Sequence, residues 1–415
     1  MSQGKQLIAS RSSTGSQQCG ARRDHSAPQS PCRGAQRRGI SGQHGHLLVR
    51  SGKLQAGLQK FPPPADRRMI WVHAVEPTAS AASAEVQGST AVQQLNDGLT
   101  QIDQYLQPVA QGRGVADEAA AVELVQRMKD AGVTIGFGGA RQVPKRVYTL
   151  AELRLNNIQT EQLLSPVDKT LNKISDRLTI AAVAGVGTLG YFQHWDSSQL
   201  LSVVILYLFG ATFDQVAAGG GISALVLDTL GRALSPTYKR RVAAHEAGHF
   251  LIAYLLGLLP QAYTLSSLDA YNRYKAFNVQ AGTVFCDSTF QQEVATGRLT
   301  SGTLDTYTCV ALAGVATEYL QFGVAEGGMG DVQQLDGLLR ALSFTQAKAD
   351  GQIRWAILNT ITLLRRHKDI HERLTDAMLA GATVGEAISV IEGELRRCPE
   401  QLQDVVAAGD GADQP

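Results

Sequence analysis

Apolar residues follow a helical pattern in the first regularly patterned part of the chain. They recur on one helical face, which ends at Gly132: Val122, Leu124, Val125 and Met128. Apolar residues three or four positions apart indicate an amphipathic helix, and the same criterion predicts helices over residues 150–164 and 167–177. Because no catalytic motif occurs here, we interpret residues 75–177 as a helical spacer or partner-binding region.

Two long uncharged runs follow, residues 178–195 and 197–213, with Asp196 between them. A membrane-spanning helix needs about 20 apolar residues, with roughly 17 as the lower limit, so both runs are short for a full span. Basic residues on both sides suit a hairpin whose ends share one compartment: Lys169, Lys173 and Arg177 before it, and Lys239, Arg240 and Arg241 after it. We interpret residues 178–234 as a hydrophobic, membrane-associated segment, with two buried helices of a soluble domain as the alternative. Trp195 suits either an interfacial anchor or a turn.

The next stretch has the features of a helix with defined ends. Ser235 is a favourable N-cap and Pro236 suits the first helical position, whereas Gly257 followed by Pro260 predicts the end. Gly248 lies in the middle of this helix, where a glycine costs about 1 kcal/mol relative to alanine. We therefore expect another backbone to pack closely against Gly248.

This helix contains the pattern His-Glu-x-x-His, which carries the clearest chemistry in the sequence. His245 and His249 are four residues apart, so both rings can face one metal ion. Glu246 lies one position on, where its carboxylate can act as a general base toward a water molecule at the ion. A catalytic zinc site needs a third protein ligand, which this pattern does not supply.

A second pair of histidines, His367 and His371, has the same spacing. Cationic residues surround it: Arg365, Arg366, Lys368 and Arg373. Because cations disfavour metal binding, we interpret this pair as part of a solvated helix face rather than as a metal site.

Composition separates a basic leader from the remainder of the chain. Hydrophobic residues make up 44% and charged residues 18% of the sequence, so a sizeable core can be buried. The net charge of +1 argues against a nucleic-acid binder. Residues 1–70 hold 12 Lys and Arg against two acidic residues, whereas the rest holds 26 against 35. The five cysteines include no Cys-x-x-Cys pair, so a cysteine zinc site is not expected and the body fits a reducing compartment.

The leader is rich in Arg, Ser, Gln and Gly and lacks the apolar core of a secretory signal. This composition is typical of an organelle transit peptide, and the abundance of Ser favours the chloroplast over the mitochondrion. We expect residues 1–74 to be a transit peptide or, alternatively, an ordinary disordered basic tail. Residues 401–415 are expected to be a disordered tail.

Two further segments carry a resemblance to a known family. Residues 312–323 read Leu-Ala-Gly-Val-Ala-Thr-Glu-Tyr-Leu-Gln-Phe-Gly, and residues 327–334 read Gly-Gly-Met-Gly-Asp-Val-Gln-Gln. With His-Glu-x-x-His upstream, they resemble the peptidase domain of FtsH zinc metalloproteases, in which an Ala-Gly-x-x-x-Glu helix precedes a Gly-rich turn and an Asn-Asp-Leu sequence. The resemblance implies zinc held by His245, His249 and Asp331. For Asp331 considered alone, a helix N-cap is the alternative.

The resemblance covers residues 236–395 and is closest to plant and algal chloroplast proteins similar to FtsH but without its ATPase module. Glu318 matches a family glutamate, which implies a supporting role beside the zinc ligands. Two positions depart from FtsH: Gly330 replaces an Asn and Val315 replaces an Arg. The sequence holds no G-x-x-x-x-G-K-[ST] phosphate-binding loop, so ATP dependence would require an FtsH-type or other ATPase partner.

These observations predict a mainly α-helical fold with a small β element, in which residues 235–400 form a zinc peptidase domain. Residues 281–285 are expected to form a strand beside the zinc helix, with an edge that can pair with a substrate backbone. The predicted function is a zinc-dependent metalloendopeptidase cleaving unfolded or membrane-associated proteins in the chloroplast, at the thylakoid or envelope membrane. The alternatives are a catalytically silent scaffold or assembly factor, and a zinc hydrolase acting on something other than peptides.

Overall fold

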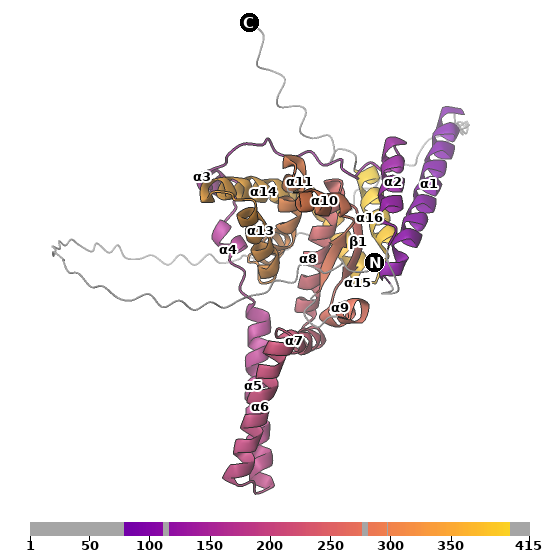
Figure 1. Cartoon of the computed structure of the whole chain (residues 1–415). Coiled ribbons are helices and arrows are strands. Elements are labelled where there is room, and N and C mark those ends of the chain that lie inside the picture. The colour runs from indigo at the N-terminus through magenta and orange to yellow at the C-terminus, as the bar shows by residue number, and fades with distance from the viewer. Residues whose placement is uncertain (1–78, 111–115, 276–280, 297, 399–415) are drawn as a thin grey trace, which may run out of the picture. The chain divides into compact units, whose positions relative to one another are not determined.

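The computed structural model describes residues 79–110, 116–275, 281–296 and 298–398, which all belong to one unit, residues 74–415 (Figure 1). The described part is mainly helical and contains two short strands, which confirms the predicted fold class. The predicted leader, residues 1–74, and tail, residues 401–415, lie outside the described residues.

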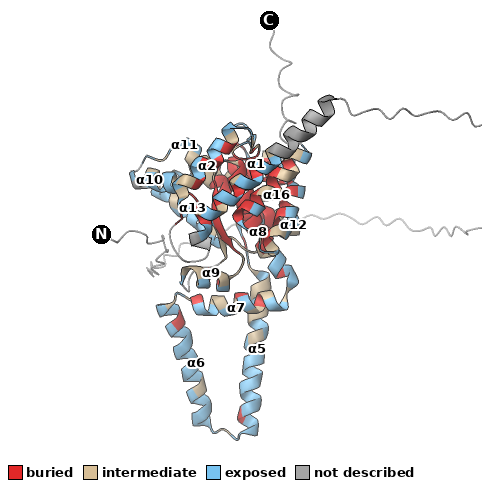
Figure 2. Ribbon diagram, turned by 90° about the vertical axis from the view of Figure 1, so that its right-hand side faces the viewer, coloured by how far each residue is buried: buried red, intermediate tan, exposed pale blue. Residues whose placement is uncertain are grey.

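Helix α8 (Pro236–Leu255) lies at the centre of the fold. Ser235 caps it by accepting a hydrogen bond from the backbone N–H of Tyr238, and Pro236 occupies its first position, as the sequence predicts. Every residue from Ala243 to Leu255 is buried, so this part of α8 contacts protein on all sides (Figure 2). The helix therefore holds its polar side chains inside the molecule.

One cluster of buried side chains joins α8 to helices from both ends of the described chain. These helices are α1 (Ala79–Ala110), α2 (Glu118–Asp130), α15 (Lys368–Leu379) and α16 (Val384–Arg397). Ile102 of α1 and Phe250 of α8 are fully buried in this cluster. Glu392 of α16 adds a polar connection, because it accepts hydrogen bonds from Tyr254 Oη and from the backbone N–H of Gly136. Helices α1 and α2, from the region expected to be a helical spacer or partner-binding region, thus share a core with α8.

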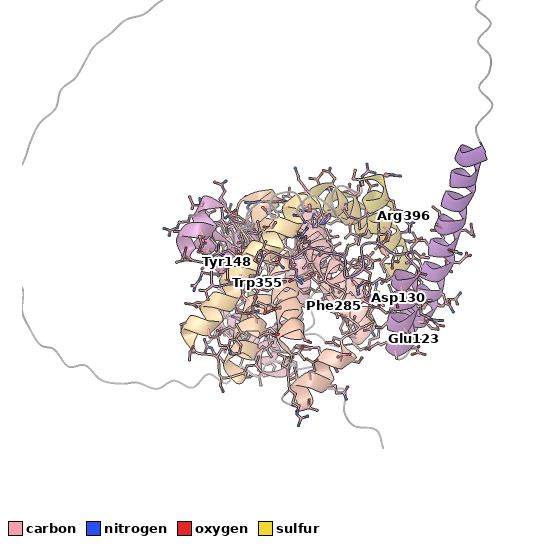
Figure 3. The ribbon with its side chains drawn as sticks, turned by 90° about the horizontal axis from the view of Figure 1, so that it is seen from above. Glu123, Asp130, Tyr148, Phe285, Trp355 and Arg396 are labelled. Atoms are coloured by element: carbon pink, nitrogen blue, oxygen red, sulfur yellow. The ribbon has the colours of Figure 1, made fainter. Side chains whose placement is uncertain are left out.

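A second cluster covers the other side of α8. It contains α11 (Ser301–Ala311), α12 (Ala313–Phe322), α13 (Met329–Ala341), α14 (Gln346–Arg366) and two short helices, α3 (Leu150–Leu155) and α4 (Thr160–Leu164). The sequence predicts one helix over residues 150–164; the chain instead breaks at Asn157, whose φ of +56° is left-handed. Tyr148 and Trp355 of this cluster lie on the opposite side of the body from Glu123 and Asp130 of α2 (Figure 3).

The two strands, β1 (Pro260–Thr264) and β2 (Gly282–Phe285), pair in an antiparallel manner beside α8. Strand β2 agrees with the predicted strand. Helix α9 (Ser267–Tyr274) follows β1, and α10 (Ser288–Thr296) follows β2. In the described part of the chain β2 has β1 as its one strand neighbour.

A helical hairpin projects from the body (Figure 2). It consists of α5 (Lys169–Phe192) and α6 (Ser197–Ala217), and α7 (Gly221–Leu234) lies across its base. Most side chains of both hairpin helices are exposed. Among the described helices, α6 is the one that is long and apolar enough to cross a membrane by length and composition.

The prediction for the second histidine pair was wrong in one respect. His367 and His371 are both buried, with exposed fractions of 1% and 3%, instead of lying on a solvated face. His371 bonds through Nε2 to the backbone carbonyl of Ala244 in α8, at 2.9 Å. The neighbouring cations suggested exposure, but a helix surrounded by other helices buries one face while its cationic side chains reach solvent on the other.

Candidate metal centre

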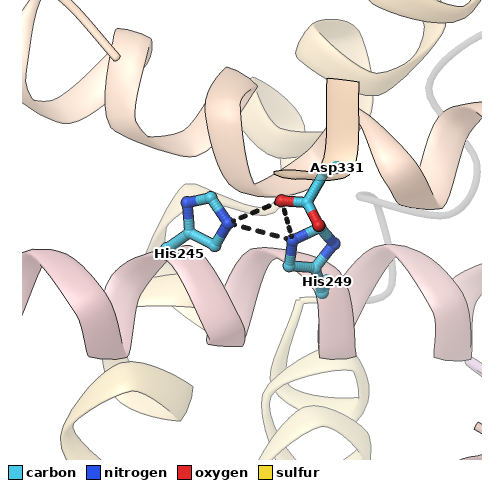
Figure 4. Close-up of side chains that lie close together, drawn as sticks. All are labelled: His245, His249 and Asp331. Atoms are coloured by element: carbon cyan, nitrogen blue, oxygen red, sulfur yellow. Dashed lines mark hydrogen bonds and ion pairs between the residues drawn. The ribbon is translucent and has the colours of Figure 1, made fainter. Parts of the chain in front are cut away.

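Three polar side chains from two helices converge at one point (Figure 4). His245 and His249 come from successive turns of α8, and Asp331 comes from the first turn of α13. The Nε2 atoms of the two histidines lie 3.1 Å apart, and Asp331 Oδ2 lies 3.1 Å from the first and 3.4 Å from the second. Ligands on a tetrahedral zinc ion lie about 3.3 Å from one another. The three atoms therefore have the mutual spacing of ligands on a shared ion, and this group could hold a metal ion.

The hydrogen bonds of the two Nδ1 atoms determine whether the Nε2 atoms of His245 and His249 carry protons. His249 Nδ1 lies 2.8 Å from the backbone carbonyl oxygen of Val310, which can only accept, so this nitrogen carries the proton. His245 Nδ1 lies 2.8 Å from a carboxylate oxygen of Glu318 and donates to it. In the neutral rings both Nε2 atoms then present lone pairs, and they face the carboxylate of Asp331. Three acceptors at such short range repel one another unless a cation or a proton lies between them.

Glu318 on α12 is the buried partner of His245. It also accepts hydrogen bonds from Arg241 Nη1 at 3.0 Å and from the backbone N–H of Glu326 at 2.9 Å. Burial alone would raise the pKa of Glu318, but the hydrogen bond and charge of His245, together with these donors, lower it to about 2. Glu318 is therefore an ionised acceptor that orients the first histidine.

The proton is the natural competitor of a metal ion at this site. Burial opposes protonation of His245, but hydrogen bonds to Asp331 and Glu318 outweigh it and raise the pKa of His245 well above its usual value. Burial also acts against ionisation of Asp331, yet the two histidines lower its pKa below the usual range. Metal binding at this site must therefore release a proton.

Helices α8 and α12 approach closely because glycine lies at their contacts. A Cβ on Gly314 of α12 would lie 2.1 Å from His245 Nε2, so a side chain there would occupy the place of the ring. A Cβ on Gly248 of α8 would lie 3.0 Å from the backbone oxygen of Ala313, which confirms the close backbone predicted at this glycine. The small residues of both helices therefore make room for the two imidazoles.

Glu246 points into the same region but is not one of the three converging ligands. Its exposed fraction is 4%, and burial raises its pKa above that of an ordinary glutamate. Thr283 of β2 donates a hydrogen bond from its hydroxyl to Glu246 Oε2, at 2.8 Å. The strand next to α8 thus fixes the orientation of this carboxylate.

A cavity of about 1100 Å³ opens onto these groups. It is lined by His245, His249, Glu246, Asp331, β2 residues and apolar side chains that include Phe285, Phe290, Tyr307 and Val310. The side chain of Asp331 is 33% exposed, whereas each histidine side chain is 9% exposed. The metal centre is therefore accessible from the side of α13, through a cleft large enough for several residues of an extended chain.

Some of these residues could not be found from the sequence pattern. Arg241 and Thr283 belong to no motif of the sequence, Gly314 lies in the Ala-Gly-x-x-x-Glu sequence without a role predicted for it, and the carbonyl of Val310 is independent of side-chain type. Asp336, five residues after Asp331, lies on the solvent side of α13 and pairs with Arg340 at 2.7 Å. The structure thus brings Asp331 to the two histidines and leaves Asp336 away from them.

Comparison with known proteins adds no identification. No family model matches the chain, and no curated protein or solved structure matches it either. The function must therefore be argued from the geometry and chemistry of the site.

Proposed function

We propose that the protein is a zinc-dependent metalloendopeptidase that cleaves extended segments of unfolded or membrane-associated proteins. The observation that carries this proposal is the convergence of two imidazole nitrogens and one carboxylate oxygen at ligand spacing, beside a buried glutamate and an open cleft. Two His and one carboxylate, with room for a further ligand, form a typical catalytic zinc set, whereas magnesium and calcium prefer oxygen ligands.

His245, His249 and Asp331 would hold the ion, and Glu318 would orient His245 through its Nδ1–H. When bound, zinc would polarise the carbonyl of the scissile peptide bond and make an attacking water more acidic. Glu246 would accept the proton of that water as general base and then donate it to the leaving amine. Burial raises the pKa of Glu246, which makes its carboxylate a stronger proton acceptor, and Thr283 would keep the carboxylate in one orientation.

The cleft favours substrates without tertiary structure. Strand β2 lines the cleft and bears Thr283 next to Glu246, and one strand neighbour is described for it. An extended peptide could pair with its other edge through backbone hydrogen bonds, which are independent of sequence. Since the chain has no phosphate-binding loop, unfolding of substrates would fall to an ATPase partner or precede binding.

The resemblance of three segments to the FtsH peptidase domain supports the same proposal. It pairs the histidines of α8 with Asp331, the same three residues whose side chains converge in the structure. A chloroplast location is proposed on the composition of the leader alone. The catalytically silent scaffold is the less favoured alternative, because Glu246 and all three ligand residues are present.

The proposal is tested with the purified full-length protein, by measuring bound zinc per chain and cleavage of an unfolded protein. The Glu246→Gln variant should keep its zinc and lose at least about 100-fold in cleavage rate, since it loses a general base and no ligand. A wild-type protein that binds zinc but does not cleave would favour the scaffold. Equal zinc loss in Glu246→Gln would contradict the separation of base from ligands.

A further inference from the structure

The hairpin of α5 and α6 is unlike the other helices of the body because it exposes apolar side chains in all directions. Five consecutive residues of α6 are more than half exposed: Ile205, Leu206, Tyr207, Leu208 and Phe209. Successive residues of a helix point about 100° apart, so five of them cover the full circumference. In α5, Ile180, Val183, Tyr191 and Phe192 are exposed to a similar degree.

This all-round exposure indicates what kind of surface would cover the hairpin. A single protein partner covers one stripe of a helix and leaves the opposite face polar. Helix α2 shows that one-sided pattern, with Leu124, Val125 and Met128 buried and charged residues facing solvent. A helix that is apolar all round needs an apolar environment all round, as in the hydrocarbon of a bilayer.

The dimensions and ends of the hairpin fit a bilayer. The 21 residues of α6 extend about 31 Å, close to the roughly 30 Å thickness of the hydrocarbon. The turn between the helices carries Trp195 and Asp196 next to Tyr191, and aromatic residues beside polar ones are typical of a membrane–water interface. At the other end Asp214 is not left unpaired, because it accepts hydrogen bonds from the backbone N–H of Ile222 and Ser223.

Helix α7 lies across the base of the hairpin (Figure 2) and has two different faces. Its buried face is fixed to the body through Asp228, which accepts hydrogen bonds from Tyr238 Oη at 2.8 Å and from the backbone N–H of Ser267 at 2.7 Å. Its exposed face contains no charged residue: Ile222, Ser223, Val226, Thr229, Ala233 and Leu234. Such a face suits a helix that lies in the plane of a membrane interface.

Exposed cations lie near the same base. Lys173 and Arg177 belong to the first three turns of α5, which also carry the exposed Asp176, and Lys239 belongs to the first turn of α8. Positively charged residues next to membrane helices are attracted to anionic lipid head groups by about 1 kcal/mol each. The apolar face of α7 is thus accompanied by charges suited to the head-group region.

We propose that the occupant of this surface is a lipid bilayer that contains anionic lipids. Helix α6 crosses the hydrocarbon, the uncharged part of α5 inserts beside it, and α7 lies at the interface between the hydrocarbon and the body. The metal centre is then held next to the membrane surface, so its substrates are extended segments of membrane proteins that lie directly beside the bilayer. This last step rests on the proposed peptidase function.

The length of α8 limits the height of the metal centre. His245 is nine residues after Pro236, which is separated from α7 by Ser235 alone, so the backbone of His245 lies at most about 14 Å beyond that end of α8, whatever the tilt of the helix. An extended chain advances about 3.3 Å per residue, and about five residues therefore reach from the interface to the metal centre. Segments that leave the bilayer can enter the cleft without being extracted from it.

Membrane binding is tested by flotation of the full-length protein with vesicles of phosphatidylcholine and phosphatidylglycerol. The wild type should float, and the double variant Ile205→Lys and Phe209→Lys should lose at least tenfold of the floated fraction. Both side chains are exposed, so the folded body should be unaffected, as circular dichroism would verify. The control Leu155→Lys changes a residue of α3 that is 82% exposed and should float like the wild type.

The substrate class is tested with one unfolded segment in three forms: soluble, joined directly to a membrane anchor, and joined through a stiff helical spacer of about 20 residues that spans roughly 30 Å. The wild type on vesicles should cleave the directly anchored form at least tenfold faster than the other two. The double variant should cleave the soluble form like the wild type and show no preference for the anchored form.

The outcomes separate the two proposals. Failure of the wild type to float, or a stable dimer in which the hairpins cover each other, would overturn the membrane anchor. Flotation with equal cleavage of the three forms would overturn the membrane-adjacent substrate class. Absence of all cleavage together with normal flotation would contradict the peptidase function and, with it, the substrate class, while leaving the anchor supported.

Discussion

Asp331 and Asp336 lie on the same helix, α13, but only the side chain of Asp331 points toward the two histidines, so only Asp331 should contribute to metal binding. We expect Asp331→Ala to lower zinc affinity by at least about 100-fold, because two imidazoles alone hold the ion poorly. Asp336→Ala should leave zinc content and cleavage unchanged, since this carboxylate is exposed and pairs with Arg340. Zinc per chain after dialysis measures the difference, and full retention in Asp331→Ala would exclude it as a ligand.

A second residue-scale prediction concerns Glu318 and acid. Its pKa lies below its ordinary value of 4.5, at about 2, so the stability it contributes is complete above about pH 4.5 and is lost as the pH falls toward 2. The loss should amount to about 3 kcal/mol. Denaturant unfolding in the presence of a chelator, across this pH range, should show the loss in the wild type.

The matched variant is Glu318→Gln, which cannot titrate. It should be less stable than the wild type near neutral pH and lose less stability in acid. With zinc present it should bind the ion about 10- to 100-fold more weakly, because the orienting partner of His245 is changed. Identical acid profiles of the two proteins would contradict the role assigned to Glu318.

At the residue scale, the sequence predicts those site residues that are close together along the chain. His245, Glu246 and His249 lie within five positions, so one helix predicts their common face. Asp331 lies 82 residues beyond His249 and was proposed only through a resemblance. Arg241 and Thr283 act through contacts between elements, and no spacing rule reveals such contacts.

At the scale of elements, the approach of α12 to α8 is the critical contact. Gly314→Ala should displace His245, because a Cβ there would lie 2.1 Å from Nε2. We expect loss of zinc binding and a decrease in stability of about 1–3 kcal/mol. The control is Gly337→Ala in α13, where nothing lies within 4 Å of the added carbon; it should be neutral or stabilise by up to about 1 kcal/mol. Zinc titration and thermal unfolding would compare the two, and normal zinc binding by Gly314→Ala would count against this packing.

The ends of elements were predicted with mixed success, for identifiable reasons. Ser235 and Pro236 predicted the start of α8 because capping is a local interaction. The predicted helix over residues 150–164 is broken because Asn157 adopts a left-handed conformation. The burial of His371 was missed because it depends on the carbonyl of Ala244 in another helix.

At the scale of the whole molecule, the body around the metal centre includes α1, which lies far from it in sequence. Ile102→Ala should destabilise the protein by about 2–5 kcal/mol, because Ile102 is fully buried in the cluster that contains α8. Val92→Ala, on the same helix but 49% exposed, should change stability by less than about 0.5 kcal/mol. Equal melting temperatures for the two variants would show that α1 does not stabilise the body.

The same packing bears on how the protein can be divided. The sequence predicted a zinc peptidase domain over residues 235–400, since all the recognised chemistry lies there. The shared core could not be predicted from the sequence. An amphipathic stripe such as that of α2 indicates that one face of the helix is buried, but it does not identify the element that buries it. We expect a fragment that begins at residue 235 to expose part of this core and to aggregate.

The hydrogen bond between His249 and the backbone carbonyl of Val310 has a consequence for how the site tolerates sequence change. Val310 lies in the last turn of α11, where carbonyl groups have no partner within the helix. The orientation of His249 therefore depends on where α11 ends rather than on the side chain at position 310. Substitutions there are limited by packing alone, whereas His245 depends on the identity of residue 318. The two histidines therefore differ in how sensitive their orientation is to point mutation. His245 is held by the side chain of Glu318, which one substitution can remove. His249 is held by a backbone carbonyl at the end of α11, which a side-chain substitution leaves in place.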